Sequence, residues 1–397
     1  TTKEFISREY VGSMDSIQYY DEISDGQTEN LNHRLNIRFE YEIDSSNSMI
    51  ITPRLSFQDN RYSSNVAGLN FLGPENLLSN TLNKYDDKST GYNFSNDLLF
   101  RHAFIKRGRT VSVNIGTTLN SSGSDSKLKA YNNFERTSNT VSDTIDQEGE
   151  YDAVQNSYSA NIMYTEPAGK KGQIYGNVGA TYSANNSDKK TNNMDPVTRE
   201  YSLMDTTLTS KFESENYKGN VGAGYRYNSG KLFFQAGLKL QRSSLTSKSV
   251  FPYKSDVDQP FTNILPDAML NLRFSRTSNL RIRYRTNTNE PSVSDLQDVV
   301  DNSDPLSLTR GNPSLKPEYS HTLMGRYSLA QIAQSRFLFL MVYIRNSLNY
   351  IGNATYTAAR DTLISDNIVL NRGSQLIVPE NMDGYWNART FFTYGFP

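Results

Sequence analysis

Four aspartates spaced three residues apart form the densest group of potential metal ligands in the sequence. They are Asp295, Asp298, Asp301 and Asp304. Calcium prefers carboxylate oxygens, so this segment could hold an ion. It lacks, however, the central glycine and the terminal glutamate of an EF-hand loop. We therefore expect solvated carboxylates here, and the sequence predicts no metal site.

The other residue types that could do chemistry are scattered. His33, His102 and His321 lie far apart and lack the spacing of metal ligands. The sequence contains no nucleophile elbow, P-loop or zinc-protease motif. The glycines within 219–224 are ordered differently from a dinucleotide-binding turn, so we expect them where a strand bends or meets an inner domain. The sequence predicts a protein that is not an enzyme and binds no cofactor.

Composition narrows the class of protein further. The 41 basic and 42 acidic residues nearly cancel, which argues against a nucleic-acid partner. The absence of cysteine excludes disulfides and thiolate metal sites. Apolar residues make up 36%, yet aromatic residues reach 12%, which a disordered chain would lack. A barrel with a lipid-facing outer surface and a water-filled interior combines a low apolar content with a high aromatic content in this way. A soluble β-solenoid could share this composition.

Strict alternation of apolar and polar residues is the main structural signal. A period of two belongs to a strand with two different faces. In the segment 33–43 the apolar positions are Leu35, Ile37, Phe39, Tyr41 and Ile43. The same alternation recurs in segments 51–58, 111–120, 217–227, 280–285 and 386–396.

One strand departs from this pattern, because Phe337–Ile344 is apolar on both faces. We expect an inward-facing apolar patch that something inside the barrel covers. A local bulge or a subunit contact are the alternatives.

Arginines occupy the polar face of these predicted strands. An arginine on the lipid face at mid-bilayer would cost about 2–4 kcal/mol, so the polar face must be the lumen. This face is either a solvated wall that pairs with carboxylates such as Glu40 and Glu42, or a track for a substrate. The lumen-facing candidates are Arg38, Arg54, Arg226, Arg281, Arg283, Arg285 and Arg389.

The predicted strands come in pairs joined by short links of hairpin-turn residues, for example Asn228-Ser229-Gly230. The links between pairs are longer, roughly 20–35 residues, against a usual median of about 4–6. We expect these long links outside the cell, at Tyr62–Thr90, Ser121–Gln155, Ser183–Tyr201 and Asn349–Glu380. The pattern predicts an all-β fold: an antiparallel transmembrane β-barrel with short periplasmic turns and long extracellular loops.

A compact motif with two prolines interrupts the pattern before the strand that resumes at Tyr319. The prolines, a glycine and an asparagine force a rigid turn, so we expect a structural entry into the barrel at its outer rim. The motif residues are Gly311, Asn312, Pro313, Leu315, Lys316, Pro317 and Glu318.

This motif resembles the Asn-Pro-x-Leu-Lys-Pro-Glu segment of TonB-dependent outer-membrane receptors. The stretch before it is similar to the Bacteroidota-type outer-membrane β-barrel branch of that group, in Glu290-Pro291-Ser292, Leu296-Gln297 and Asn302-Ser303-Asp304-Pro305. The resemblance implies a 22-stranded barrel with an N-terminal plug, in the outer membrane of a Gram-negative bacterium. It implies TonB-driven import of a nutrient such as a metal chelate or a glycan.

The expected partners are outer-membrane lipid, the plug of the same chain and, through it, TonB, with a surface lipoprotein as a further possibility. We expect residues 1–397 to be a barrel fragment without plug, signal peptide or barrel C-terminus, because both ends look cut. A non-transporting adhesin or scaffold and a passive porin are the alternative functions.

Overall fold

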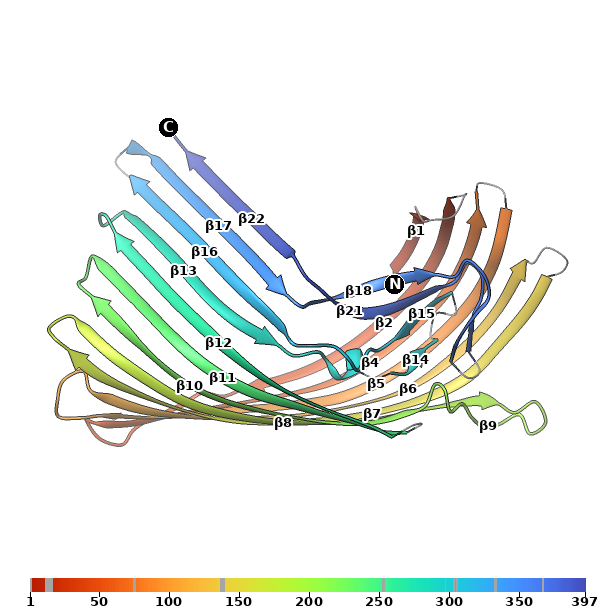
Figure 1. Ribbon diagram of the computed structural model, residues 1–397, viewed down its shortest axis with the longest axis horizontal. Helices are drawn as coiled ribbons and strands as arrows, with labels where there is room; N and C mark the ends of the chain where they lie inside the picture. The colour runs from red at the N-terminus through yellow and green to blue at the C-terminus, as the bar shows by residue number, and fades with distance from the viewer. Residues whose placement is uncertain are drawn as a thin grey trace.

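The computed structural model describes residues 2–10, 17–73, 76–135, 140–251, 254–296, 298–302, 304, 306–331, 334–365 and 368–397. Within these ranges, sixteen strands form one antiparallel sheet, here called the wall. The wall curves into a trough, with β1 and β22 as its two edges (Figure 1). The predicted all-β, antiparallel fold is confirmed.

The wall strands follow the chain order as a series of hairpins, with short β3 paired to β4 and β9 paired to β8. They are β1 (Thr2–Tyr10), β2 (Gln18–Asn36), β3 (Phe39–Glu42), β4 (Asn47–Leu72), β5 (Asn76–Ala103), β6 (Thr110–Glu135), β7 (Thr140–Ala168), β8 (Gly172–Met194), β9 (Tyr201–Met204), β10 (Ser210–Asn228), β11 (Leu232–Phe251), β12 (Ser255–Arg273), β13 (Ser278–Asn289), β16 (Glu318–Gln331), β17 (Arg336–Leu348) and β22 (Tyr385–Gly395).

Two stretches leave the wall and fold onto its concave side; we call 290–317 and 349–384 the inner segments. They form a mixed sheet in the order β14-β15-β21-β18, in which β15 and β21 run parallel (Figure 1). Their elements are the single helical turn α1 (Val293–Leu296), β14 (Val300–Asp301), β15 (Ser307–Arg310), β18 (Tyr350–Thr357), β19 (Thr362–Ser365), β20 (Ile368–Leu370) and β21 (Gln375–Met382).

The strand register shows which residues share a face of the wall. In an antiparallel ladder, directly paired residues point to the same side. One such row crosses five strands, and all of its side chains are exposed: Ile162, Val178, Val221, Leu240 and Ile264. None of the described elements packs against this row, which is the pattern of a surface that meets lipid.

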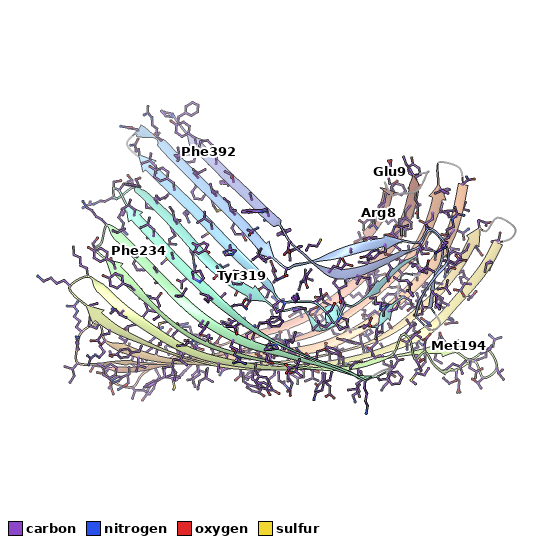
Figure 2. The ribbon with its side chains drawn as sticks, in the orientation of Figure 1. Arg8, Glu9, Met194, Phe234, Tyr319 and Phe392 are labelled. Atoms are coloured by element: carbon purple, nitrogen blue, oxygen red, sulfur yellow. The ribbon has the colours of Figure 1, made fainter. Side chains whose placement is uncertain are left out.

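The apolar band covers only part of each strand. In β10 it runs from Tyr217 to Tyr227, close to the roughly 10 residues that a tilted spanning strand needs. Phe234 and Phe392 lie at the end of the trough that carries the apolar band. Arg8, Glu9 and Met194 lie at the opposite end (Figure 2). The wall therefore continues well beyond the band as a polar extension.

These polar extensions differ from the expected long loops. Most of Tyr62–Thr90, for example, belongs to β4 and β5, which pair almost continuously from Asn47 to Leu72. The same holds for much of Ser121–Gln155 in β6 and β7. Side-chain pairs between neighbouring strands, such as Lys129 with Asp146 at 3.2 Å, stabilise these extended strands. The local sequence of either strand does not reveal such pairs.

Proline and glycine explain two local features of the wall. Pro53 lies opposite Ile37 and has no N–H to donate, and the ladder between β2 and β4 is interrupted there before β3 begins. Gly224 lies under the buried ring of Tyr175, and a Cβ at this position would collide with that ring. The sequence predicted these glycines at a bend or against an inner domain, whereas Gly224 makes room for a side chain of the wall itself.

Buried apolar residues gather between the wall and the inner segments. One cluster joins Phe212 and Leu245 of the wall to Leu296 and Leu315 of the first inner segment. A second joins Leu208 to both inner segments, and a third joins Tyr20 and Phe134 to Leu306. The inner segments are therefore packed parts of the fold. None of the described helices is long and apolar enough to cross a membrane.

Candidate ligand groove on the concave face

The Gly311–Glu318 motif connects the first inner segment to the wall. Leu315 is only 1% exposed. The Asn312 side chain donates to the carbonyl of Pro379 at 3.1 Å and accepts from the Ser314 amide at 3.0 Å. Asn381 bonds both the amide and the carbonyl of Lys316. The motif thus ties both inner segments together, and β16 begins at Glu318, one residue before the strand start predicted at Tyr319.

Glu318 anchors this junction electrostatically. Its carboxylate accepts from Arg345 of β17 at 2.6 Å and from Asn289 of β13 at 3.2 Å. Burial alone would raise the pKa of Glu318, but hydrogen bonds from Ser347, Asn289 and Arg345 outweigh it and hold the pKa below its usual range. The first inner segment therefore ends on an ionised carboxylate shared by three wall strands.

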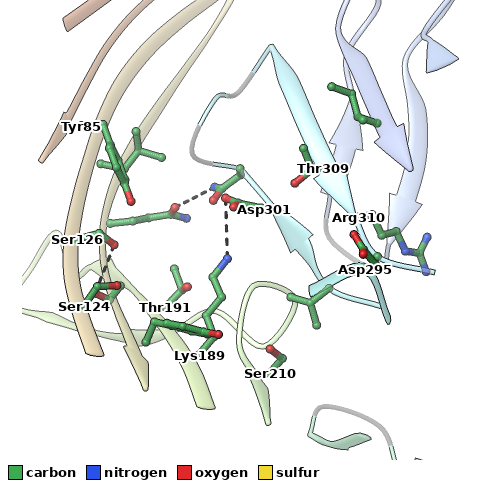
Figure 3. Close-up of a pocket in the computed structure, with 18 of the residues that line it drawn as sticks. Tyr85, Ser124, Ser126, Lys189, Thr191, Ser210, Asp295, Asp301, Thr309 and Arg310 are labelled. Carbon is green, nitrogen blue, oxygen red and sulfur yellow. Dashed lines mark hydrogen bonds and ion pairs between the residues drawn. The ribbon is translucent and has the colours of Figure 1, made fainter. Parts of the chain in front are cut away.

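Between the wall and the inner segments lie two cavities of about 480 and 470 Å³. The first is bounded by β5–β10 on one side and by β14, β15 and β21 on the other (Figure 3). The second is bounded by β6–β11 and by the segment from Glu290 to Leu296. Tyr151 lines both cavities, so we treat them as one groove.

The wall side of the groove is a regular array of small polar side chains. One cross-strand row runs Ser124, Tyr151, Lys189 and Ser210 over β6, β7, β8 and β10. A second row on the same face, four residues away along each strand, consists of Asn120, Gln155, Asn185 and Ser214. Because these residues alternate with outward-facing ones, the array is a direct product of strand periodicity.

The charged side chains at the groove are paired. Lys189 lies 3.9 Å from Asp301 of the first inner segment (Figure 3). Lys218 bonds Glu290, and Arg310 bonds Asp298. Among the described lining residues, three basic side chains (Lys189, Lys218, Arg310) stand against three carboxylates (Asp295, Asp301, Glu290). The groove is polar and has no net formal charge.

The structure separates the aspartates that the sequence places together. Asp298 and Asp301 have the partners given above, and Asp295 accepts from the Ser292 amide at 3.0 Å. Asp304 is half-buried near Tyr20, and loss of solvation raises its pKa. Within the described ranges, no three histidine or acidic side chains are grouped to hold a metal ion. Gln297, Ser303 and Pro305 lie outside the described residues.

A scan against protein-family models matches residues 102–396, about three quarters of the chain, to the outer membrane protein β-barrel family. The chain belongs to this family. Its place is accordingly the outer membrane of a Gram-negative cell. No curated protein matches the sequence.

The solved structures that the chain resembles include two receptors and a transporter. The hemophore receptor HasR of Serratia marcescens is 11% identical, with a TM-score of 0.46, over 92% of this chain and 60% of that one. The ferric enterobactin receptor PfeA of Pseudomonas aeruginosa is 8% identical, with a TM-score of 0.48, over 98% and 58%. The copper transporter OprC is 10% identical, with a TM-score of 0.48, over 98% and 58%. The chain thus spans less than two thirds of these structures.

In this outer-membrane barrel chain, the arginine candidates share one face. Register places Arg54, Arg226, Arg281, Arg283, Arg285 and Arg389 on the same side of the wall as the groove residues. Arg38 precedes β3 and bonds Glu40, one of its expected partners. The arginines of β13 lie side by side on one strand, whereas Arg389 on β22 is separated from them by β16 and β17, and Arg54 and Arg226 lie on β4 and β10.

The strand Phe337–Ile344 brings apolar side chains to this same face. Phe339 packs edge-to-face on Phe391, with ring centroids 5.8 Å apart. The guanidinium of Arg326 lies 5.0 Å from the Phe339 centroid, within range of a cation–π contact. Register adds Met341, the partner of both Arg326 and Phe391. The predicted inward patch is therefore an apolar surface rimmed by arginine.

Sequence reasoning missed the groove itself. Serine, asparagine and aspartate dominate the segments that contain Tyr151 and the serines of β6 and β8, and this composition predicts loops. The available signal was the alternation within 124–129, where the inward positions Ser124, Ser126 and Leu128 alternate with Asp125, Lys127 and Lys129. That alternation separates two polar faces, so hydrophobicity alone does not detect it.

Proposed function

We propose that this chain forms part of the wall of an outer-membrane importer that binds a nutrient at its extracellular side and takes it up by TonB-coupled active transport. The observation that carries the proposal is the groove: inner segments packed on the concave face enclose a cavity lined by side chains of both the wall and the inner segments. A passive pore needs an unobstructed water path, whereas a receptor needs a shaped site. The family assignment supports the membrane location.

The wall also offers a surface for a plug domain. The patch around Phe339, Met341 and Phe391 faces the concave side at the level of the apolar band. Apolar side chains rimmed by arginines suit contact with an acidic, partly apolar inner domain. We propose that the plug of a 22-stranded barrel covers this patch and transmits the force of TonB, and that Arg281, Arg283 and Arg389 pair with its carboxylates.

An uptake experiment on the full-length receptor tests the proposal. A deletion strain and its complemented parent are grown with defined nutrients: ferric citrate, haem, or neutral oligosaccharides as carbon source. We expect the deletion to lose uptake of one nutrient, and a protonophore or loss of TonB to abolish that uptake in the parent. Uptake that survives the protonophore would indicate a passive pore. Unchanged uptake of every nutrient, with loss of surface adhesion, would indicate an adhesin.

A further inference from the structure

The inward side chains of β6, β7, β8 and β10 share one chemical property at the groove: most are uncharged and can both donate and accept hydrogen bonds. Hydroxyl and amide groups have this dual capacity, whereas carboxylates only accept and ammonium groups only donate. Six of them suffice to show the pattern: Ser122, Ser126, Asn185, Ser187, Thr191 and Asn216. A ligand that matches them must offer donors and acceptors of its own at short intervals.

Some of this capacity is unused within the protein. Ser210 Oγ, Asn216 Oδ1 and Glu290 Oε1 are buried atoms of the groove lining that have no hydrogen-bond partner in the described structure. Buried polar atoms in native proteins nearly always have a partner, either protein, water or ligand. Ser210 lines the first cavity, and Asn216 and Glu290 line the second, so residues with unused hydrogen-bonding capacity occur along the whole groove.

The charge balance of the groove disfavours an ionic ligand. Lys189 faces Asp301, and Lys218 is paired with Glu290. An anionic chelate would have to displace these carboxylates, which would leave a charge unpaired at a partly buried site. A neutral ligand leaves both pairs intact.

Two tyrosines add flat apolar faces to the polar array. Tyr151 lines both cavities, and Tyr85 lines the first (Figure 3). Burial raises the pKa of both phenols, so both keep their hydroxyl proton at neutral pH. Each ring can therefore cover the C–H face of a ligand while its hydroxyl donates a hydrogen bond.

From these four features we infer that the groove binds a neutral, polyhydroxylated chain, the chemistry of an uncharged oligosaccharide, with Tyr151 at its centre. This inference names the ligand class of the proposed import function, and it rests on that function for how the ligand reaches the groove. Each cavity lies within the range of roughly 300–1,000 Å³ of small-ligand sites, and their junction at Tyr151 suits several linked units better than one compact ligand.

Direct binding to the purified full-length receptor tests the inference. The probes are an array of neutral oligosaccharides, a tryptic peptide mixture, ferric citrate and haem, followed by calorimetry on any binder. We expect a neutral oligosaccharide to bind. Tyr151→Ala should weaken its affinity about tenfold through loss of the aromatic face. Asn185→Leu, which keeps the branched shape but removes the amide, should weaken it roughly two- to tenfold.

Tyr131→Ala is the matched control, because Tyr131 lies on the outward face of β6 and is 58% exposed. It should bind like the parent. Binding of peptides or ferric chelates alone, binding of none of the probes, or equal saccharide affinity in the Tyr151 and Tyr131 variants would overturn the inference. Energy-coupled uptake of a chelate without saccharide binding would refute only this inference. Saccharide binding without energy-coupled uptake would refute only the import function.

Discussion

Replacing Leu315 by alanine should loosen the inner segments without disturbing the membrane-spanning wall. Leu315 is 1% exposed and packs with Phe212 and Leu245 of the wall and with Leu296. A buried Leu→Ala change typically costs about 2–5 kcal/mol, partly from lost burial and partly from the cavity left behind. The apolar band lies elsewhere on the strands, so this loss should fall on the attachment of the inner segments.

Limited proteolysis of the full-length receptor measures this loss. If local opening precedes cleavage, a destabilisation of about 3 kcal/mol raises the open population, and the cleavage rate within 290–317, by roughly a hundredfold. Leu323→Ala is the control, because Leu323 is 41% exposed on the outward face of β16. It should leave the cleavage rate near that of the parent.

The reasoning is refuted if Leu315→Ala receptor inserts normally and its inner segments are cleaved as slowly as those of the parent. It is also refuted if both leucine variants accelerate cleavage equally. In either case the inner segments would not depend on this cluster, and the groove would need another support.

Three further predictions concern the junction, the wall and the topology. The folded protein holds the pKa of Glu318 below its ordinary value of about 4.5, so the ionised carboxylate should stabilise the inner segments above about pH 4.5. This stabilisation should be lost as the pH falls through the lower pKa of the folded state. Pepsin cleavage should show this dependence in the parent and lose it in Glu318→Gln. Gly224→Ala should collide with Tyr175 and cost about 1–3 kcal/mol in urea unfolding, and an unchanged midpoint would contradict this. Protease added to intact cells should cut the exposed turn at 195–200 and spare Gly108, and the reverse would invert the topology.

The faces of the wall could be predicted from sequence because strand periodicity is local. Alternation around Leu35, Val113 and Ile282 places each residue on one side, and the register keeps these assignments consistent across neighbouring strands. The length of the strands could not be predicted in the same way. In 62–90 the residues have low strand propensity, and pairing with neighbouring strands outweighs that propensity.

The groove depends on contacts between residues far apart in the chain. Gln18 donates to the carbonyl of Gly373 at 2.7 Å, and Asn302 donates to Gln147 at 2.9 Å. Nothing in the local pattern of either partner indicates the other. The motif at 311–318 predicted a rigid turn before a strand. It did not predict the two hydrogen bonds between Lys316 and Asn381 that join the motif to the second inner segment.

Labelling of single cysteines tests the central assignment most directly, since the chain has no cysteine of its own. Val113 and Asn114 are neighbours in β6 whose side chains leave opposite faces of the wall. In the full-length receptor in membranes, Val113→Cys should react with a lipid-soluble maleimide and Asn114→Cys with a water-soluble one. The opposite preference, or equal labelling of both sites by both probes, would contradict the account.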